Sequence, residues 1–295
     1  MNHAQERYGL HATCFEEWFD ANSIDEFENV ARKESISKGD PSLQSPEYWN
    51  SSFFHGKFLK YAADLAGKSY IIKLQEEEAP ELPFVEYLCN QIANNLGMKI
   101  PPYHLIMFHG KPAFVTQNLL GKHADIKSLV HIYHYVEIPE NYNCETLVKI
   151  IHAQTQNMRD IDNFVDICLF DGLIGNHDRH GRNLGLIIDA YNKSLCPVYD
   201  NTSVLGLEQG EILKANFSPR GKIATEKSNE PTLKDYVQDF LRLGHRNIVV
   251  DFYHRIKMNE IEALIEMSLC SDLMKSAFSK LIKSRYAEIT DAIQD

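Results

Sequence analysis

The sequence predicts an α+β fold in which a small β-rich N-terminal lobe is followed by a larger helical C-terminal lobe. Short β-prone runs surround a single helix before about residue 120, whereas apolar positions recur at helical spacing through most of the chain beyond it. The 295 residues are 44% hydrophobic, which suffices for two lobes that share a cleft. We therefore expect an N-terminal extension at 1–30, an N-lobe at 31–120 and a C-lobe at 121–295.

The first part of the chain is expected to hold a short helix, a loop and a hairpin. The acidic N-terminal extension has one helix, expected around Cys14–Phe19. Ser, Gly, Asp and Pro, which favour turns, gather at 34–45 and predict a loop. The turn-forming pair Ala66-Gly67 separates two β-prone runs, Gly56–Ala62 and Ser69–Leu74. We expect these two runs to pair as a hairpin.

A helix and a second pair of strands complete the predicted N-lobe. Pro83 suits the first turn of a helix, and Gly97 suits its end. Between them, apolar residues recur at helical spacing, namely Val85, Leu88, Ile92 and Leu96. Two further strands, Tyr103–Met107 and Ala113–Gln117, flank the turn His109-Gly110. The expected order is therefore strand, strand, helix, strand, strand.

The predicted C-lobe has its most apolar helix at Asp160–Ile174. Apolar residues on nearly every side of this helix predict that it is buried, and Gly175 and Asn176 end it. Two short strands follow, Leu184–Ile188 and Leu195–Tyr199, and they are expected to form a hairpin. The segment 231–295 has periodic apolar positions and is expected to be mostly helical.

Composition narrows the class of protein. A formal net charge of −11 argues against a chain that binds DNA or RNA by itself. The six cysteines contain no Cys-x-x-Cys pair and fit the reduced thiols of the cytoplasm. The first residues are too polar for a signal peptide, and no apolar run is long enough for a transmembrane segment. We therefore expect a cytoplasmic protein. Secretion as an effector by a route without a cleaved signal would not be detectable from the polarity of the first residues.

One polar segment between apolar elements carries residues suited to phosphoryl transfer. This reaction needs a carboxylate near the attacking hydroxyl and oxygen ligands that hold Mg²⁺ on the phosphates of ATP. In GNHDRHGRN (175–183), Asp178 precedes Asn183 by five residues, the spacing of Asp and Asn in the kinase catalytic loop. The following hairpin would return Asp200 beside them. We therefore predict Asp178 as catalytic base, and Asn183 and Asp200 as magnesium ligands.

A lysine and a glutamate upstream extend this pattern. Lys73 lies near the end of a β-prone run, and Glu86 lies on the helix that follows. In kinases a strand lysine holds the α- and β-phosphates of ATP and pairs with a helix glutamate. Such a pair is commonplace by itself, but its position before the Asp178 segment favours a role in binding ATP.

The polar segment permits two other interpretations. Its residue types are common in exposed turns, but a position between a very apolar helix and an apolar hairpin disfavours a simple turn. His177, Asp178 and His180 are also types that bind zinc or iron, yet no third ligand follows at fixed helical spacing. His131 and His134, in HIYHYVE, suit an ordinary helix face or strand. We therefore expect His180 to orient the catalytic loop.

These motifs resemble those of the HipA-like serine/threonine protein kinases, which include the short HipT toxins and the CtkA effector kinase. The resemblance rests on LFDGLIGNHDRHGRN (169–183) and CPVYDNTS (196–203), with SYIIKLQ (69–75) and EYLCNQIANNLGMKIP (86–101) upstream. It implies a bilobal protein-kinase-like fold, ATP and Mg²⁺ as cofactors, and a protein serine or threonine as acceptor. Full HipA proteins carry an extra N-terminal subdomain, so HipT and CtkA are the nearer comparison.

The resemblance also implies roles for residues by position. Lys73 matches the ATP lysine and Asp178 the base, while Asn183 and Asp200 match the metal ligands. The place of the hinge, which touches adenine mostly through backbone groups, is taken by Thr116, Gln117 and Asn118.

The phosphate-covering loop of this family contains a serine that is autophosphorylated in some members. Ser35 and Ser37 in ESISKGD resemble the short form of this loop found in HipT. The sequence departs from HipA here, because KGDP (38–41) follows in place of the Gly-x-Gln-x-Lys continuation. The resemblance therefore implies autophosphorylation at Ser35 or Ser37 with a loop of altered geometry.

Partners and rival functions follow from the same comparison. A HipT-like protein implies a small antitoxin partner, whereas a CtkA-like protein implies a lone effector. The alternative enzyme is a phosphoinositide or small-molecule kinase, because phosphatidylinositol 4-kinases carry a similar Asp-Arg-His-x-x-Asn loop. The negative net charge of the sequence disfavours a substrate in an anionic membrane. The second alternative is a pseudokinase binding module, which the intact set Lys73, Asp178, Asn183 and Asp200 disfavours.

Overall fold

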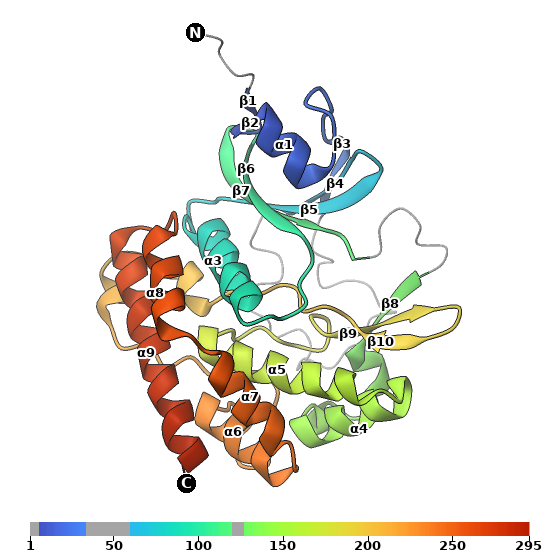
Figure 1. Cartoon of the computed structure of the whole chain (residues 1–295), viewed down its shortest axis with the longest axis vertical. Helices are drawn as coiled ribbons and strands as arrows, with labels where there is room; N and C mark the ends of the chain where they lie inside the picture. The colour runs from blue at the N-terminus through green and yellow to red at the C-terminus, as the bar shows by residue number, and fades with distance from the viewer. Residues whose placement is uncertain (1–5, 34–59, 120–126, 295) are drawn as a thin grey trace.

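A computed structural model describes residues 6–33, 60–119 and 127–294. A five-stranded sheet lies at one end of the molecule and a group of helices at the other, with helix α3 (Leu82–Asn95) between them (Figure 1). The expected combination of a strand-rich N-terminal part and a helix-rich C-terminal part is therefore confirmed as a mixed α/β architecture.

The five-stranded sheet is antiparallel and has the order β3-β4-β5-β7-β6. Its strands are β3 (Glu28–Lys33), β4 (Lys60–Leu65), β5 (Lys68–Leu74), β6 (Tyr103–Phe108) and β7 (Lys111–Gln117). The turn between β4 and β5 is formed by Ala66 and Gly67, whose φ angles of +47° and +80° suit a tight hairpin. Strands β4 and β5 pair as predicted, but the first strand was expected at Gly56–Ala62 and continues to Leu65; its residues 56–59 and the predicted loop at 34–45 lie outside the described residues. Strands β6 and β7 confirm the second predicted pair, and β3 is an additional edge strand.

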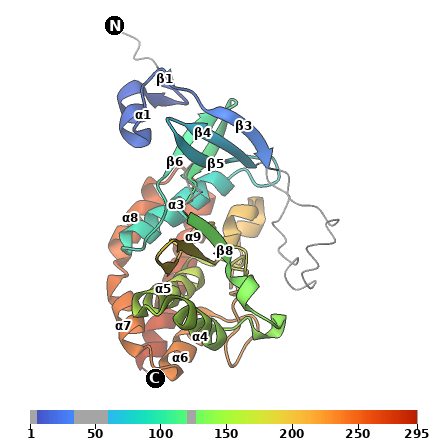
Figure 2. The same cartoon turned by 90° about the vertical axis from the view of Figure 1, so that its right-hand side faces the viewer.

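The residues before β3 pack on this sheet and form a first hydrophobic core with it (Figure 2). They comprise β1 (Glu6–Arg7), β2 (Leu10–His11) and α1 (Ala12–Phe19), and α1 confirms the short helix expected there. Phe15 and Phe19 are fully buried, and the ring of Phe19 packs edge-on against Tyr70 of β5. This core supports the face of the sheet opposite α3.

Helix α3 belongs to a second and larger core. It has Pro83 in its first turn, and Gly97 follows it with a φ of +72°, as the sequence predicted. The helix contacts β6 and β7, and it also contacts α8 (Met258–Met267) in the helical part. Val85 and Leu88 are fully buried in the larger core. Helix α3 therefore joins the sheet to the helices.

The larger core is built around α5 (Met158–Ile174), which confirms the predicted buried helix. Helix α5 contacts α4 (Cys144–Thr155), α6 (Leu233–Arg242), α7 (Arg246–Arg255) and α9 (Asp272–Gln294). The last four helices of the chain confirm the helical content predicted for 231–295. In the part of the chain that the structure describes, no helix is both long and apolar enough to cross a membrane.

A small second sheet, of order β10-β9-β8, corrects one prediction. Its strands are β8 (Lys127–His131), β9 (Gly185–Asp189) and β10 (Lys193–Leu195). The second predicted strand was expected to continue to Tyr199, but β10 ends at Leu195, because Pro197 lacks an N–H and the N–H of Val198 donates to Lys99 instead. Strand β8 was not predicted.

Candidate active site

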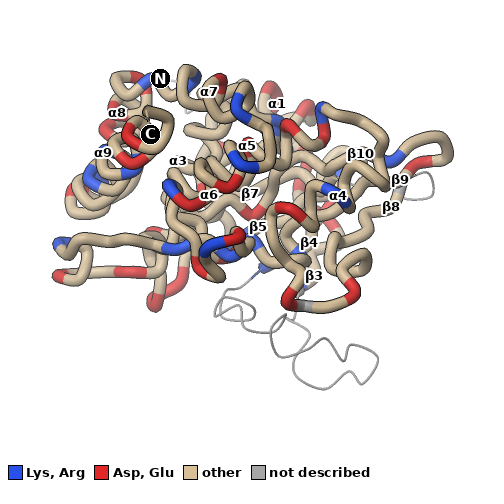
Figure 3. Tube along the Cα trace, turned by 90° about the horizontal axis from the view of Figure 1, so that it is seen from below, with Lys and Arg blue, Asp and Glu red and all other residues tan. Residues whose placement is uncertain are grey.

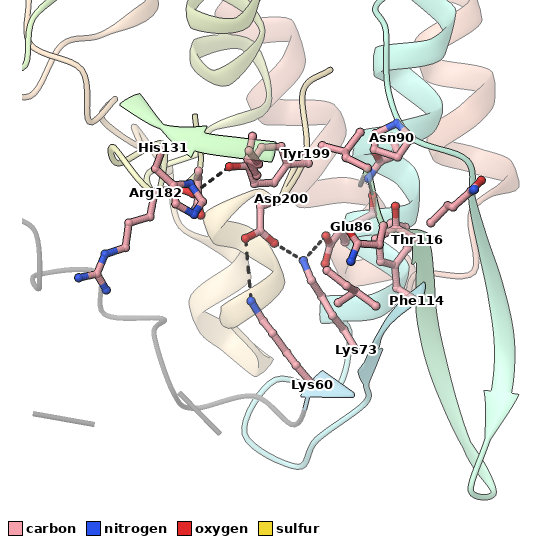
Figure 4. A pocket seen from close by; sticks show the side chains of 17 residues that line it. Lys60, Lys73, Glu86, Asn90, Phe114, Thr116, His131, Arg182, Tyr199 and Asp200 are labelled. Atoms are coloured by element: carbon pink, nitrogen blue, oxygen red, sulfur yellow. Dashed lines mark hydrogen bonds and ion pairs between the residues drawn. The ribbon is translucent and has the colours of Figure 1, made fainter. Parts of the chain in front are cut away.

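A cavity of about 430 Å³ lies between the five-stranded sheet and the loops next to β8 and β9 (Figure 4). We call this cavity the cleft. Its volume is in the range of small-molecule sites in proteins. The cleft brings together many of the residues that the sequence predicted for the site: Lys73, Glu86, Thr116, Gln117, Asn118, Asn183 and Asp200.

Lys73 points from β5 into the cleft, where its ammonium contacts both Glu86 of α3 and Asp200 (Figure 4). Lys73 and Glu86 are almost completely buried. Burial by itself lowers the pKa of Lys73, but the charges of Asp200 and Glu86 outweigh it and raise the pKa above its ordinary value. The lysine therefore stays charged, as a group that holds phosphates must.

Asp200 also faces a second lysine. Lys60 of β4 lies directly opposite Lys73 in the sheet, and its Nζ is 3.9 Å from Asp200 Oδ2 (Figure 4). Burial raises the pKa of Asp200, but Lys60 and Lys73 outweigh it and hold the pKa well below its usual range. Asp200 is therefore ionised at physiological pH. Its φ of +56° is in the left-handed region, which Asp adopts more readily than most residues.

Lys60 was not predicted as a site residue, although the sequence contains a signal for it. A two-residue hairpin turn at Ala66-Gly67 places position 60 opposite position 73. Two lysines directly opposite each other repel, unless a negative group lies between their ammonium groups. The pair therefore indicates an anion beside the hairpin, and Asp200 is such a group.

The polar segment 175–183 places Asp178 beside Asn183. Helix α5 ends at Gly175, which has a φ of +71° and whose added Cβ would lie only 2.5 Å from Pro219 Cγ. Asn183 Nδ2 donates to the backbone oxygen of Asp178 at 2.8 Å and lies 3.4 Å from Asp178 Oδ2. Because the amide nitrogen is engaged, Asn183 Oδ1 is the atom available to a cation.

The carboxyl of Asp178 lies in a desolvated position next to another acid. Burial, followed by the negative charge of Asp200, raises its pKa to about 7. Lys60 and Arg179 act in the opposite direction but do not cancel these effects. A carboxyl with a pKa near neutral can accept a proton and release it again, which suits a general base.

A buried ion pair, which was not predicted from the sequence, fixes the segment 175–183. Arg179 Nε and Nη2 donate to the two carboxylate oxygens of Asp171 in α5 at 2.8 and 2.9 Å. Arg179 also donates to the backbone oxygens of Asn183 and Tyr199. Both charged side chains are almost completely buried. The available signal was Asp171 itself, the one charged residue in the apolar second half of α5, ICLFDGLI (167–174).

The histidines of the segment differ in their environment. His180 Nε2 lies 3.8 Å from Asp178 Oδ1, and its Nδ1 accepts from the backbone N–H of Arg182 at 3.1 Å. His177 Nδ1 is instead 2.8 Å from the backbone oxygen of Arg220. Within the described ranges, no three His, Cys, Asp or Glu side chains are arranged to hold a metal ion. The zinc or iron interpretation therefore gains no support.

The predicted hinge lies at the end of β7 and lines the cleft. The N–H of Gln117 donates to Pro102 and that of Asn118 to Ser69, at 2.8 and 2.7 Å. Thr116 Oγ1 donates to Pro102 as well, at 3.3 Å. These donors are occupied within the protein, so an adenine ring would have to use other groups of this segment. Ser35 and Ser37 lie outside the described residues.

Comparison with known proteins identifies the family. Residues 50–272 match the HipA-like C-terminal domain, which is more than half of the chain. The chain belongs to the HipA-like family. The resemblance stated from the sequence motifs is thereby confirmed.

Curated relatives of this HipA-like chain are named as kinases. It is 29% identical over 195 residues to the putative kinase Y4dM of Sinorhizobium fredii, an alignment that covers 59% of this chain and 47% of Y4dM. It is 22% identical over 233 residues to the serine/threonine-protein kinase CtkA of Helicobacter pylori, covering 70% of this chain and 71% of CtkA. The chain thus spans about half the length of Y4dM.

Solved structures show the same fold at low sequence identity. The crystal structure of the H. pylori proinflammatory kinase CtkA superposes with a TM-score of 0.66 at 18% identity, covering 80% of this chain and 93% of that one. HipA of Shewanella oneidensis, solved with HipB and operator DNA, gives a TM-score of 0.57 at 12% identity and covers 90% of this chain and 74% of that one.

Proposed function

We propose that this HipA-like chain is an ATP- and magnesium-dependent serine/threonine protein kinase. The observation that carries the proposal is the arrangement of Lys73, which bridges Glu86 and Asp200 in one cleft with Asn183 at its edge. These are the residue types and the order that phosphoryl transfer from ATP requires. The kinase names of the relatives support the same reaction.

The residues around the cleft suit a magnesium ion and a triphosphate. Asp200 supplies an ionised carboxylate and Asn183 a free amide oxygen, both hard oxygen donors. Asp200 and Asn183 would hold the Mg²⁺ ion, which would supply positive charge to offset that of the phosphates. Lys73 would hold the α- and β-phosphates, and Glu86 keeps its ammonium in place. Lys60 is near enough to Asp200 to contact a phosphate bound there.

Asp178 is proposed as the base that accepts the proton of the acceptor hydroxyl. Its backbone N–H donates to Asn176 Oδ1 at 2.9 Å, and Asn183 donates to its backbone oxygen, so two contacts hold the residue in place. His180 is proposed to orient this loop through its contact with the N–H of Arg182.

A pH profile tests the role of Asp178. With a pKa of about 7, kcat/KM for MgATP should rise about tenfold per pH unit below neutrality and level off above it, because only the ionised carboxyl accepts a proton. Initial rates across this range would be measured beside thermal unfolding, which controls for loss of folded protein. A profile that is flat through pH 6 to about 8 would contradict the assignment.

We also propose that the two parts of the fold act as the lobes of a bilobal kinase. Residues 31–120 would form the N-lobe with the phosphate loop, the ATP lysine and the hinge, and 121–295 the C-lobe with the catalytic loop. Residues 1–30 would be an extension of the N-lobe. The position of the cleft, which residues of both parts line, supports this division, while α3 packs into the larger core and joins the two parts.

The acceptor is proposed to be a protein hydroxyl rather than a lipid. CtkA, a relative at 22% identity, is named a serine/threonine-protein kinase. Lysines and arginines alternate with acidic residues along the trace instead of forming one basic face in the view of Figure 3. A membrane-binding kinase needs such a basic face to meet anionic lipid. This observation favours a protein substrate over a phosphoinositide.

Transfer of labelled phosphate tests the acceptor class. Purified protein with γ-labelled ATP and Mg²⁺ should label serine or threonine in a cell extract and should not label phosphoinositide in liposomes. Label found only on lipid would overturn the protein-kinase proposal.

Intact mass of the purified kinase after the same incubation tests self-phosphorylation. We expect added phosphate in the wild type and none in the variant Ser35→Ala with Ser37→Ala. An unchanged wild-type mass would contradict autophosphorylation at these serines.

The biological role that we propose is that of a toxin or effector kinase acting from the cytoplasm. The named relatives support it, since one neighbour is a toxin solved with its antitoxin and another is a proinflammatory kinase. A small antitoxin partner is expected in the first case and a lone effector in the second.

A further inference from the structure

We propose that Asn90 and Asn201 are positioning residues that join helix α3 to the catalytic loop through one buried chain of hydrogen bonds. The proposal rests on the kinase function, because this series of hydrogen bonds, which we call the hydrogen-bond chain, has Glu86 at one end and Asp178 at the other. Asn90 lies one helical turn after Glu86, and Asn201 directly follows Asp200. Neither residue was selected from the sequence.

The first half of the chain runs from α3 to the guanidinium of Arg179. Asn90 Nδ2 donates to the backbone oxygen of Glu86 at 2.8 Å. Asn201 Nδ2 donates to Asn90 Oδ1 at 3.1 Å and has only a longer contact, of 3.4 Å, to the oxygen of Val198. Arg179 Nη2 donates to Asn201 Oδ1 at 2.8 Å. The chain therefore connects the helix that carries Glu86 with the loop that carries Asp178.

The second half runs from Arg179 to the base. Arg179 is held by both oxygens of Asp171, and Asp171 Oδ1 also accepts from Asn176 Nδ2 at 2.8 Å. Asn176 Oδ1 in turn accepts from the backbone N–H of Asp178 at 2.9 Å. Every link between the backbone of Glu86 and that of Asp178 is thus a hydrogen bond within the protein.

The direction of the chain is set by its charged member. A guanidinium can only donate, so Asn201 must present its oxygen to Arg179 and its nitrogen to Asn90. Asn90 must then present its oxygen to Asn201 and its nitrogen to the Glu86 carbonyl. The two amides have one arrangement that satisfies all partners. A single geometry of this kind fixes α3 relative to the loop.

The burial of these amides argues against a role in overall stability alone. Asn90 is 4% exposed, Asn201 is fully buried and Arg179 is 1% exposed. Replacing a hydrogen-bonded pair of such amides with apolar side chains of the same shape changes stability little, because the desolvation of both amides offsets most of the gain from their hydrogen bonds. A single substitution costs more, because it leaves one amide without its partner. Their effect is therefore expected in the relative placement of Lys73, Asp200 and Asp178 and so in catalysis, with a smaller effect on overall stability.

A double-mutant cycle with shape-conserving substitutions tests the chain. Asn90→Leu and Asn201→Leu should each lower kcat about tenfold or more, while the KM for ATP changes less than about threefold. The double variant should be no slower than Asn201→Leu alone, because both single changes break the same link. Asn95→Leu is the matched control: it removes a hydrogen bond from the same helix, to Glu260, and should leave kcat within about twofold.

Hydrogen exchange supplies a readout that needs no activity. In Asn90→Leu the amides of 176–183 should exchange faster than in the wild type, while those of α9 stay unchanged. Rates of the single variants near wild type, additive losses in the double variant, or faster exchange throughout the molecule would each overturn the proposal. If the wild type transferred no phosphate at all, the kinase function would fail, and selective exchange in 176–183 would still decide whether the chain couples the two elements.

Discussion

Replacing Asp178 with Asn should lower the rate of phosphoryl transfer by about 10²–10⁴-fold, because the acceptor hydroxyl loses its base. Affinity for MgATP should change little, since Lys73 and Asp200 remain. Rates would be measured with γ-labelled ATP under single-turnover conditions. The exposed carboxylate Asp251, on the surface of α7, provides the control: Asp251→Asn should transfer phosphate like the wild type. Unchanged activity in Asp178→Asn would favour the pseudokinase alternative.

The same substitution should make the fold more stable. The carboxyl has a pKa of about 7 in the folded protein and 3.8 ordinarily, so its ionisation above pH 7 costs up to about 4 kcal/mol of folding free energy. Asn carries no charge and avoids this cost. Denaturant unfolding at pH 8 should show the stabilisation, and at pH 5 the difference should fall below about 2 kcal/mol, because the folded wild type is then protonated. A destabilised Asp178→Asn at pH 8 would contradict the raised pKa.

The second large effect is expected at Arg179. Replacing it with Leu should lower the free energy of unfolding by about 3–5 kcal/mol, because Asp171 is left as an uncompensated buried charge. Equilibrium unfolding in denaturant measures this. Adding Asp171→Asn to Arg179→Leu should restore part of the loss, since no buried charge then remains.

An exposed ion pair provides the comparison for Arg179. Lys283 on α9 pairs with Glu262 on α8 at 3.1 Å, and its side chain is 59% exposed. Lys283→Ala should cost less than about 1 kcal/mol. Losses of similar size in Lys283→Ala and Arg179→Leu would show that the buried pair contributes no more to stability than an exposed one.

The elements of the fold could be predicted where the signal was local. Pro83 and Gly97 mark the ends of α3, Gly175 marks the end of α5, and Ala66-Gly67 forms the turn between β4 and β5. Proline fixes φ and glycine permits a positive φ, so these residues mark turns and helix ends by themselves and no knowledge of distant partners was needed. The four C-terminal helices were predictable from apolar periodicity, which is also a local pattern.

The elements that depend on distant partners were missed or misplaced. Strand β8 is defined by its pairing with β9, far along the chain, and has no turn signal of its own. The end of β10 depends in part on Val198, whose N–H bonds to Lys99; Pro197, which lacks an N–H, was a local signal that the prediction did not use. Such pairings arise only once the chain has folded, so single-sequence patterns do not indicate them.

Some residues of the candidate site could be predicted from the sequence, and others could not. Lys73, Asp178, Asn183 and Asp200 could be selected because phosphoryl transfer needs those residue types in that order. The residues that hold them in place are Asp171, Arg179, Asn90 and Asn201, and these were not selected. Their role depends on burial and on contacts between separate elements, which are known only from the structure.

The central claim is that one cleft holds MgATP between Lys73 and Asp200, and calorimetric titration of the full chain with ATP tests it most directly. We expect binding that strengthens when Mg²⁺ is added, a gain that Asp200→Asn abolishes because the ionised metal ligand is lost. Lys73→Met should weaken binding, whereas Asp178→Asn should bind as the wild type does. ATP affinity that is the same with Mg²⁺ and with a chelator, and that neither Asp200→Asn nor Lys73→Met changes, would contradict the account.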